Sequence, residues 1–333
     1  MKVVTAIDSF KGSMTSMEAG FAAAEGIHRV DAEAEVLVRP LADGGEGTVE
    51  ALVAGMNGKT EHVKVTGPLG EPVICEYGII ESTKTAVIEM AGAAGITQVP
   101  DEKRNPLYTT TYGVGEVIKD AIEKGCRRFI VGIGGSATND GGVGMLQALG
   151  YAFLDKDGKQ VLPGARGLKD ITEITDAYVI PELAECKFRV ACDVTNPYTG
   201  ENGAAAVFGP QKGATPAQVQ LLNNGMAHLA ALLPNAVRAL PGAGAAGGLC
   251  GGLYGVLGGS TQSGFDLLAA LADLDSAIAG ADLVITGEGR TDRQTLMGKL
   301  PYRVAQRAKK LGKRCVVISG DGDGTLVGDK VIT

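Results

Sequence analysis

Short apolar runs rich in Val and Ile alternate with longer stretches of helical pattern along this sequence. At the N-terminus, Val3–Ile7 predict a strand, Ser16 predicts the cap of a helix that extends to about His28, and Glu35–Val38 predict a second strand. A strand, a helix and a second strand in this order form a βαβ unit with parallel strands. The alternation therefore predicts an α/β fold built on parallel sheets.

The C-terminal part of the chain repeats this pattern. Asp282–Thr286 and Cys315–Ser319 predict strands on either side of a helix from about Pro301 to Leu311. We therefore expect a discontinuous first domain, formed by residues 1–63 and 281–333 and apparently short at its C-terminus, with residues 64–280 inserted as a second α/β domain. A length of 333 residues is enough for two domains.

The middle of the chain has a different texture, with a turn-rich run of strands before further helix and strand pattern. Predicted strands are His62–Val65, Val73–Ile79, Thr85–Met90, Arg128–Ile133 and Lys187–Cys192, and predicted helices are Glu46–Met56, Tyr112–Lys124 and a helix that begins at Gly144–Leu149. The hairpin-like strands indicate a region separate from the opening βαβ unit.

Composition excludes several classes of protein. The 50 glycines are about twice the ordinary ~7% share, yet they lack a Gly-X-Y period, and 45% hydrophobic residues is too high for a disordered chain. The net charge of −7, with no block of Lys or Arg, argues against nucleic acid or an anionic membrane as the main partner.

No segment predicts export or membrane insertion. The N-terminus is too short and too acidic in its apolar run for a signal peptide, so we expect a cytoplasmic protein. The uncharged stretch Ala239–Phe265 is rich in glycine and predicts loop and buried small-residue packing rather than a membrane helix. The six scattered cysteines contain no C-x-x-C pair and predict free thiols, and the three isolated histidines predict no catalytic or metal role.

Five glycine-containing segments carry charged, hydroxyl or amide side chains that hydrophobic packing does not explain. Asp8-Ser9-Phe10-Lys11-Gly12 follows the first strand, where ligands bind in open parallel sheets, although Asp8 or Ser9 could equally cap the next helix. Residues 42–48 contain Asp43 and Glu46 at the start of a predicted helix; the two carboxylates could hold Mg²⁺, and Asp43 could instead be a simple N-cap.

The third segment, residues 132–142, joins a predicted strand to a helix. Its backbone N–H groups and hydroxyls suit a phosphate or carboxylate. The candidate ligand-binding residues here are Gly134, Gly135, Ser136, Thr138, Asn139 and Asp140. The segment also matches the loose dinucleotide pattern G-x-G-x-x-A, but the acid about 20 residues later, Asp155, lies in a polar turn rather than at a strand end.

The last two segments also follow predicted strands. Asp193 lies just beyond one strand, and Asn196 and Lys212 could reach the same pocket. Residues 286–290 contain Glu288 and Arg290, for which an ordinary charged turn is the alternative. Acids and basic side chains at several strand ends indicate a metal-assisted, phosphate-handling site, while the sequence lacks both the P-loop pattern and the G-x-S-x-G elbow.

In these segments the sequence resembles the type I glycerate kinases, a family of bacterial glycerate 2-kinases. The resemblance spans about residues 1–319 and rests on seven motifs in family order: residues 8–12, 42–48, 132–142, 192–197, 208–213, 241–248 and 285–290. It implies transfer of the ATP γ-phosphate to D-glycerate, most often at the 2-hydroxyl, with Mg²⁺. It also implies a Rossmann-like or flavodoxin-like parallel-sheet domain with an inserted α/β domain and an active site in the cleft between them.

The resemblance suggests roles for the candidate residues. Asp193 is our choice for the base near the attacking hydroxyl, and Asp8, Lys11 and Lys212 are the further catalytic candidates. Lys11, Lys212 and Arg290 suit the glycerate carboxylate or the phosphates. Asp43, Glu46 and Glu288 are the Mg²⁺ candidates, and Ser9, Gly134, Gly135, Ser136, Thr138, Asn139, Asp140 and Asn196 are candidate contacts for either ligand.

The expected partners are ATP and D-glycerate, without nucleic acid or membrane, and a homodimer is left open. Two alternatives are an NAD-dependent oxidoreductase of a small hydroxy acid and an inactive relative that binds small acids. The chain departs from the family beyond Ser319, where the family continues with further strand and helix. We expect the polar, glycine-rich tail to pack loosely and to leave a sheet edge open.

Overall fold

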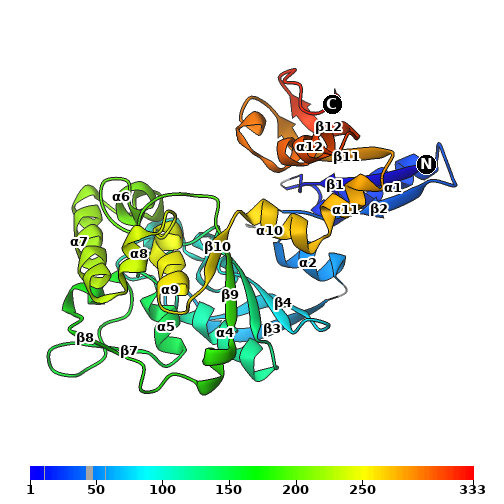
Figure 1. Cartoon of the computed structure of the whole chain (residues 1–333). Helices are drawn as coiled ribbons and strands as arrows, with labels where there is room; N and C mark the ends of the chain where they lie inside the picture. The colour runs from blue at the N-terminus through cyan, green and yellow to red at the C-terminus, as the bar shows by residue number, and fades with distance from the viewer. Residues whose placement is uncertain (11, 43–47, 57) are drawn as a thin grey trace. The chain divides into compact units, whose positions relative to one another are not determined.

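The computed structural model describes residues 1–10, 12–42, 48–56 and 58–333 (Figure 1). Contacts between residues divide the chain into two compact units, which we call unit 1 and unit 2. Unit 1 contains Met1–Gly58 and Gly264–Thr333, and unit 2 contains Lys59–Ser263. Both units combine helices with a sheet that includes parallel strands, so the predicted mixed α/β class is confirmed.

Unit 1 contains a five-stranded sheet in the order β13-β12-β11-β1-β2, in which every neighbouring pair is parallel. Its strands are β1 Lys2–Ile7, β2 Glu35–Val38, β11 Leu283–Thr291, β12 Arg314–Gly322 and β13 Lys330–Ile332. Its helices are α1 Ser16–His28, α2 Thr48–Gly55, α10 Gly264–Leu271, α11 Leu274–Ala279 and α12 Leu300–Lys310. Both ends of the chain thus contribute strands to one sheet.

The connections from β1 and from β11 cross the sheet in opposite directions. The connection through α1 leads from β1 to β2 on one side, and the connection through α12 leads from β11 to β12 on the other. Because parallel crossovers are right-handed, α1 and α12 cover opposite faces of the sheet. The carboxyl ends of β1 and β11 therefore flank a topological switch point, where open α/β sheets bind their ligands.

Helix α1 begins one residue later than its cap, and the cap is Thr15 rather than the predicted Ser16. The Thr15 hydroxyl accepts a hydrogen bond from the backbone N–H of Glu18, and the Glu18 carboxylate accepts one from the backbone N–H of Thr15. The buried Ser16 hydroxyl instead donates to the carbonyl of Ile7 at 2.5 Å and accepts from the N–H of Leu41 at 3.0 Å. Ser16 therefore ties the helix to the end of β1.

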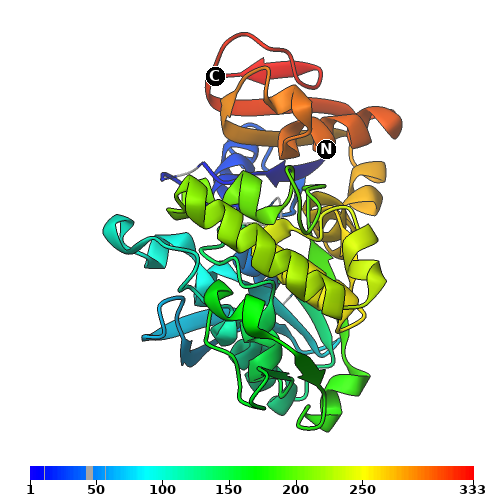
Figure 2. The ribbon, with the colours of Figure 1, turned by 90° about the vertical axis from the view of Figure 1, so that its left-hand side faces the viewer.

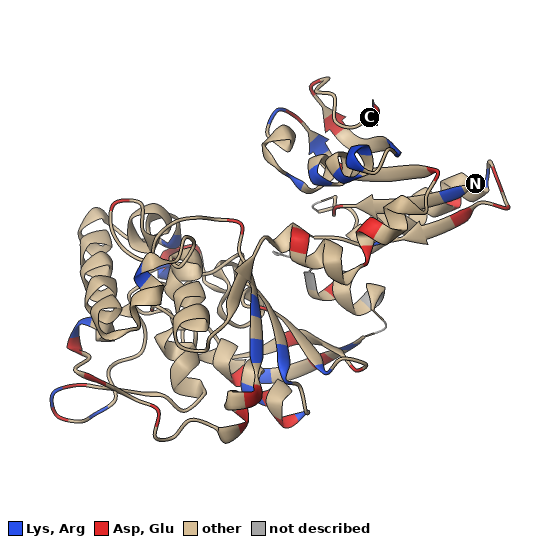
Figure 3. Cartoon of the chain, viewed as in Figure 1, with Lys and Arg blue, Asp and Glu red and all other residues tan. Residues whose placement is uncertain are grey.

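The packing of α12 depends on ion pairs as well as on its apolar face. Figure 3 shows the basic residues of this helix in blue and acidic residues of α10 and α11 in red. The Arg307 guanidinium lies 2.8 Å from the Asp266 carboxylate of α10 and 2.6 Å from the Asp275 carboxylate of α11. The sequence predicted residues 264–280 as part of the inserted domain. These ion pairs explain why the contacts of residues 264–280 place them in unit 1 instead.

The C-terminal tail is more ordered than its composition suggested. Strand β12 continues to Gly322, and β13 pairs with it in parallel. Val327 is buried, and the Asp329 carboxylate accepts a hydrogen bond from the backbone N–H of Cys315 at 2.6 Å. The expectation of a loosely packed tail therefore differs from the structure, because one apolar side chain and one carboxylate anchor the polar segment.

Unit 2 contains a six-stranded sheet in the order β10-β9-β6-β5-β4-β3. The strands from β10 to β5 are parallel, whereas β4 and β3 are antiparallel to their neighbours. The sheet strands are β3 Lys59–Thr66, β4 Pro72–Ile80, β5 Thr85–Glu89, β6 Arg128–Gly132, β9 Lys187–Ala191 and β10 Ser260–Gln262, and a small separate sheet holds β7 Ala152–Leu154 and β8 Glu173–Thr175. The predicted hairpin strands therefore extend the parallel sheet of this unit.

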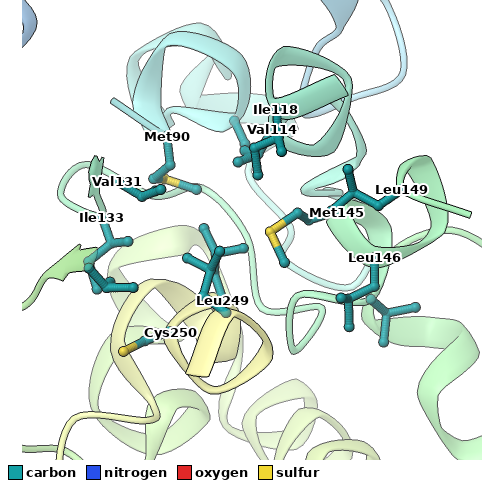
Figure 4. Close-up of a cluster of buried hydrophobic side chains, with 14 of the residues drawn as sticks. Met90, Val114, Ile118, Val131, Ile133, Met145, Leu146, Leu149, Leu249 and Cys250 are labelled. Atoms are coloured by element: carbon teal, nitrogen blue, oxygen red, sulfur yellow. The ribbon is translucent and has the colours of Figure 1, made fainter. Parts of the chain in front are cut away.

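The helices of unit 2 bury a large apolar core. They are α3 Ala91–Ala94, α4 Tyr112–Glu123, α5 Val143–Ala148, α6 Ala204–Phe208, α7 Pro216–Leu232, α8 Asn235–Ala239 and α9 Leu249–Gly255. Figure 4 shows Val114 and Ile118 of α4 lying near Met145 of α5 and Leu249 of α9. Helix α7, the longest in the described residues, is the long light-green ribbon of Figure 2.

The stretch Ala239–Phe265 is only partly the loop that its composition predicted. It contains α9 and β10 and the start of α10. A Cβ atom at Gly251 of α9 would lie 2.7 Å from the Tyr198 ring, so this helix needs glycine to pack closely. Glycine disfavours a helix locally by about 1 kcal/mol relative to alanine, and burial against the rest of unit 2 overrides that preference.

Candidate active site

The loop at residues 133–142 follows β6, and backbone hydrogen bonds hold it against residues 94–96. The N–H of Ile96 donates to the carbonyl of Gly135 at 2.8 Å, and the N–H of Ala137 donates to the carbonyl of Ala94 at 2.9 Å. Gly135 has a φ of +70°, which favours glycine at this turn. Gly134 and Gly135 are exposed, so this part of the loop is accessible to a ligand.

Lys212 ends a short 3₁₀ turn, Pro210–Lys212, and its side chain reaches the same loop. The Lys212 ammonium donates to the carbonyl of Thr138 at 2.5 Å and to the Ser136 hydroxyl at 3.3 Å. The residue is only 3% exposed, and this burial lowers the pKa of Lys212 to about 7, against the opposing attraction of Asp140. Three candidate residues from two distant motifs are thus brought together.

Asp140 serves the loop itself. Its carboxylate accepts hydrogen bonds from the N–H and the hydroxyl of Thr111, at 2.8 and 2.9 Å. It also accepts from the N–H groups of Gly142 at 3.1 Å and Gly144 at 3.3 Å. Burial raises the pKa of Asp140, and these four hydrogen bonds oppose that rise. The geometry gives Asp140 a role in holding the loop.

The side chains between Ser136 and Asp140 also point into the protein. Thr138 and Asn139 are fully buried, and the Asn139 amide nitrogen lies 2.9 Å from the Met226 sulfur. The Asn139 amide oxygen is buried and has no hydrogen-bond partner within the described ranges. Direct contact with a ligand is therefore easier for Gly134, Gly135 and Ser136 than for Thr138, Asn139 or Asp140.

Asp193 lies at a neighbouring strand end. Gly132 of β6 is the register partner of Ala191 of β9, so the loop after β6 and the segment after β9 begin side by side. Asp193 is exposed, whereas Asn196 is half-buried and donates from its amide to the carbonyl of Asn202 at 2.9 Å. Two sequence motifs that are far apart in the chain therefore meet at the carboxyl ends of two neighbouring strands of the unit 2 sheet.

The residues of unit 1 gather at its switch point. Ile7 is the register partner of Gly287, which places Asp8 and Ser9, just after β1, next to Glu288 in the second half of β11. The N–H of Ser9 donates to the Asp8 carboxylate at 2.8 Å. The alternative for this segment, a helix cap, does not describe it, because Thr15 caps α1.

Glu288 and Arg290 both have partners within unit 1. The buried Glu288 carboxylate accepts a hydrogen bond from the Thr295 hydroxyl and lies 3.5 Å from the Lys299 ammonium. The exposed Arg290 guanidinium lies 3.6 Å from the Asp321 carboxylate. Both of these residues can exchange their partners for a ligand only by breaking an ion pair.

Three predicted site residues, Lys11, Asp43 and Glu46, lie outside the described residues. Among the residues that the structure does describe, no group of three or more His, Cys, Asp or Glu side chains is arranged to hold a metal ion. In the same part of the chain, no helix is long and apolar enough to cross a membrane.

Two threonines of the site had no place in the sequence prediction. The Thr109 hydroxyl donates to the carbonyl of Ala137 at 2.9 Å, and the Thr111 hydroxyl accepts from the N–H of Met145 at 2.9 Å while it donates to Asp140. Both residues are buried. The run Thr109-Thr110-Thr111 directly before a predicted helix is the signal that could have drawn attention to them.

The dinucleotide pattern of residues 132–137 lacks its structural context. Asp155 follows β7, which lies in the separate two-stranded sheet rather than beside β6. A dinucleotide site needs the acid at the end of the adjacent parallel strand. The oxidoreductase alternative is therefore not supported.

Comparison with known proteins points to one family. The model of the glycerate kinase family matches residues 3–328. The glycerate 2-kinase of Escherichia coli K12 is 46% identical over 324 residues, which cover 96% of this chain and 85% of that protein. The glycerate kinase of Bacillus subtilis 168 is 47% identical over the same length and with the same coverage.

A solved structure agrees with the sequence relatives. A crystal structure from Salmonella typhimurium LT2, provisionally named glycerate kinase 2, is 45% identical to this chain and superimposes with a TM-score of 0.93. The match covers 100% of this chain and 90% of that one. With a family model that spans nearly the whole sequence, and relatives of this identity, the chain belongs to the glycerate kinase family and is an enzyme of the kinase class.

Proposed function

We propose that this glycerate kinase transfers the γ-phosphate of ATP to the 2-hydroxyl of D-glycerate and releases ADP and 2-phospho-D-glycerate. The observation that carries the proposal is the buried Lys212, whose ammonium donates a hydrogen bond to the loop after β6, beside the strand end that precedes Asp193, in a chain 46% identical to a protein named glycerate 2-kinase. The resemblance also supports a cytoplasmic location, where ATP is available.

Phosphoryl transfer needs positioned reactants, neutralised charge and a base beside the attacking hydroxyl. Asp193 is the candidate base, because its exposed carboxylate follows β9 and can accept a proton from a hydroxyl held at this edge. Accepting that proton would increase the nucleophilicity of the oxygen as its bond to phosphorus forms. The proton would leave with water once the product dissociates.

Lys212 is the candidate for neutralising charge. With a pKa of about 7 it holds its proton loosely in the unliganded protein. A carboxylate or phosphate near its ammonium would raise that pKa and so favour the charged form. Ligand binding and protonation of Lys212 would therefore be coupled.

The exposed backbone of Gly134 and Gly135 and the Ser136 hydroxyl are the candidate hydrogen-bond donors for an anionic group. Asp8, Ser9 and Arg290 at the switch point of unit 1 are further candidates, with Lys11 beside them in the sequence. Asn196 remains a predicted ligand contact. Thr138, Asn139 and Asp140 act through the shape of the loop.

Mg²⁺ would arrive with ATP as part of the nucleotide substrate. Of the predicted ligands, only Glu288 falls within the described residues, and its carboxylate is engaged by Thr295 and Lys299. That arrangement does not fit a metal ligand, so we assign no step to a metal bound there.

The proposal is tested by incubating the enzyme with ATP, Mg²⁺ and D-glycerate and measuring ADP release in a coupled assay. Phosphorus NMR of the product then distinguishes 2-phosphoglycerate from 3-phosphoglycerate. ADP release without phosphorylated glycerate would contradict the kinase proposal, and a 3-phosphoglycerate signal would contradict the site of transfer. A glycerate-dependent change in intrinsic fluorescence or melting temperature without turnover would favour the inactive acid-binding alternative.

A further inference from the structure

Arg104 lies between α3 and α4, in a segment that is bound on both sides of it to the loop after β6. Before it, the backbone N–H of Ile96 donates to the carbonyl of Gly135 at 2.8 Å. After it, the Thr109 hydroxyl donates to the carbonyl of Ala137 at 2.9 Å. Arg104 is therefore held close to the part of the loop that is accessible to a ligand.

The turn that carries Lys212 packs directly on Arg104. Gly213, which follows Lys212, has a φ of +91°. A Cβ atom at Gly213 would collide with the carbonyl oxygen of Arg104 and lie 2.7 Å from its Cβ atom, so this approach requires glycine. The Lys212 ammonium in turn reaches the Ser136 hydroxyl of the loop at 3.3 Å. Two basic residues thus come from adjoining positions beside the same loop.

The guanidinium of Arg104 has one hydrogen-bond donor to spare. Its Nη2 atom lies 2.8 Å from the Asp101 carboxylate. Its Nε atom is buried and has no hydrogen-bond partner among the described residues. A buried donor without a partner is costly, so a ligand that supplies an acceptor would be favoured. The Arg104 side chain is 31% exposed, which leaves it open to a ligand from solvent.

Asp101 shows which chemical group this guanidinium accepts. Its side chain is 85% exposed, and an ion pair with so exposed a partner contributes little to stability. A small carboxylate can therefore replace Asp101. A guanidinium binds a carboxylate best through two parallel N–H···O bonds, for which Nε and Nη2 of Arg104 are neighbouring donors. Because Nε is covered, the guanidinium must turn to present both donors, and breaking the link to Asp101 permits that turn.

Arg104 and Lys212 are suited to different anions. An ammonium is a compact point charge that suits a phosphate, whereas the planar guanidinium matches a carboxylate. Burial lowers the pKa of Lys212 to about 7, so that side chain is only partly charged at neutral pH. The arginine keeps its charge throughout this range.

We propose that Arg104 binds the carboxylate of D-glycerate and thereby makes the enzyme select the hydroxy acid over glycerol, in which a CH₂OH group replaces the carboxylate. The identity of the acceptor rests on the proposed function. The assignment adds a carboxylate-binding residue to a loop whose other donors, Gly134, Gly135 and Ser136, remain for the phosphates.

Arg104→Met tests the assignment by steady-state kinetics in which D-glycerate and ATP are varied in turn. Loss of the charged hydrogen bonds should raise the KM for D-glycerate about 10- to 100-fold and change the KM for ATP less than about twofold. Lys103→Met removes the same charge from the exposed neighbouring position and should keep both values. A rise in the KM for ATP instead would assign Arg104 to the phosphates and overturn the proposal.

Asp101→Asn separates ligand binding from support of the fold. The amide cannot form the ion pair, so the guanidinium is released for the acceptor and the KM for D-glycerate should fall about two- to fivefold. If Arg104 only supported the segment, loss of its partner would leave this KM unchanged or raise it, and that result would refute the proposal even if Arg104→Met failed to fold.

Isothermal titration calorimetry with ADP and Mg²⁺ present measures acceptor binding without turnover. The wild-type enzyme should bind D-glycerate in preference to glycerol, and Arg104→Met should lose that preference. Binding of D-glycerate without phosphoryl transfer would refute the proposed function and leave the role of Arg104 standing. Normal turnover with equal D-glycerate affinity in the wild type and Arg104→Met would refute the role of Arg104 alone.

Discussion

At the level of single residues, Lys212 combines two requirements that oppose each other. Its ammonium has two hydrogen-bond acceptors, the carbonyl of Thr138 and the hydroxyl of Ser136, but almost no water. The sequence motif identified Lys212 and Ser136 as site residues. It could not predict burial of the lysine, because burial depends on residues more than 70 positions away in the chain.

The pKa of Lys212 predicts how stability depends on pH. In the unfolded chain the lysine keeps its proton up to about pH 10.5, whereas in the folded protein it loses it near pH 7. The unfolded state therefore binds more protons between these values, and stability contributed by this group should rise with pH, by at most about 1.4 kcal/mol per pH unit. Lys212→Met should abolish this rise and most of the kinase activity.

Urea unfolding of both proteins at pH 7, 8 and 9 measures the difference. Lys156→Met, at an exposed position in a turn, is the control and should follow the wild-type curve. Parallel curves for Lys212→Met and the wild type would show that Lys212 keeps an ordinary pKa in the folded state.

Asp193→Asn tests the candidate base. The amide keeps the shape of the side chain but cannot accept the proton, so we expect kcat to fall by about 10²- to 10⁴-fold. Because Asp193 is exposed, the melting temperature should change little. Steady-state kinetics and thermal unfolding measure the two effects, with Asp157→Asn as an exposed control. A variant with near-normal kcat would remove Asp193 from the mechanism.

At the level of elements, the loop after β6 has its shape fixed by contacts from several distant segments. Thr109 and Thr111 precede α4, Lys212 follows α6, and the carbonyl of Gly247 accepts a hydrogen bond from the N–H of Gly141 at 2.9 Å. The glycines of the motif indicated a tight turn. The partners from Thr109, Thr111, Lys212 and Gly247 could not be predicted, because none of them is local in sequence.

Asp140→Asn should loosen this loop. In the Asn variant an NH₂ group, which is a donor, takes the place of one carboxylate oxygen that accepted hydrogen bonds from N–H groups. Part of the four-bond arrangement is therefore lost. We expect a loss of about 1–3 kcal/mol in the free energy of unfolding. Thr111→Ser keeps the hydroxyl and is the matched control. Unfolding in urea measures both, and equal stability of Asp140→Asn and wild type would contradict the role of Asp140.

Gly247→Ala probes the approach of the glycine-rich segment to the loop. Gly247 has a φ of +66°, and a Cβ atom there would lie 2.0 Å from the carbonyl oxygen of Thr138. Gly258 has a φ of +65° with nothing within 4 Å of the corresponding position. Gly258→Ala should therefore cost only the roughly 1–2 kcal/mol of the left-handed backbone, and Gly247→Ala should cost more. Similar melting temperatures for the two variants would show that the loop shifts to accommodate a Cβ atom at position 247 without loss of stability.

At the level of the whole molecule, the chain forms two units of which the first is assembled from both ends. The matching βαβ patterns at the two termini predicted this discontinuity. The contacts divide the chain at 58/59 and 263/264, whereas the sequence placed the boundaries at 63/64 and 280/281. The residues in question, β3 and the α10–α11 pair, are allocated by long-range pairing and ion pairs rather than by local pattern.

Nucleotide preference is a property of the whole protein and is tested by thermal unfolding. A ligand that binds only the folded state stabilises it by about 2.7 kcal/mol at 100 times its Kd. ATP with Mg²⁺ should raise the melting temperature, and NAD at the same concentration should not. Protection by NAD alone would contradict the kinase assignment of the loop after β6.

The sequence by itself determined the α/β class, the opening strand–helix–strand unit and the motifs that identify the family. These features depend on periodicity, capping and residue type within short segments, which act before the chain is folded. Tertiary structure decided the order of the strands, the burial of Lys212 and the helix α9 in a glycine-rich stretch. Each of these depends on which distant segments share a buried surface, because burial and hydrogen bonding across the core outweigh the local preferences of the residues involved.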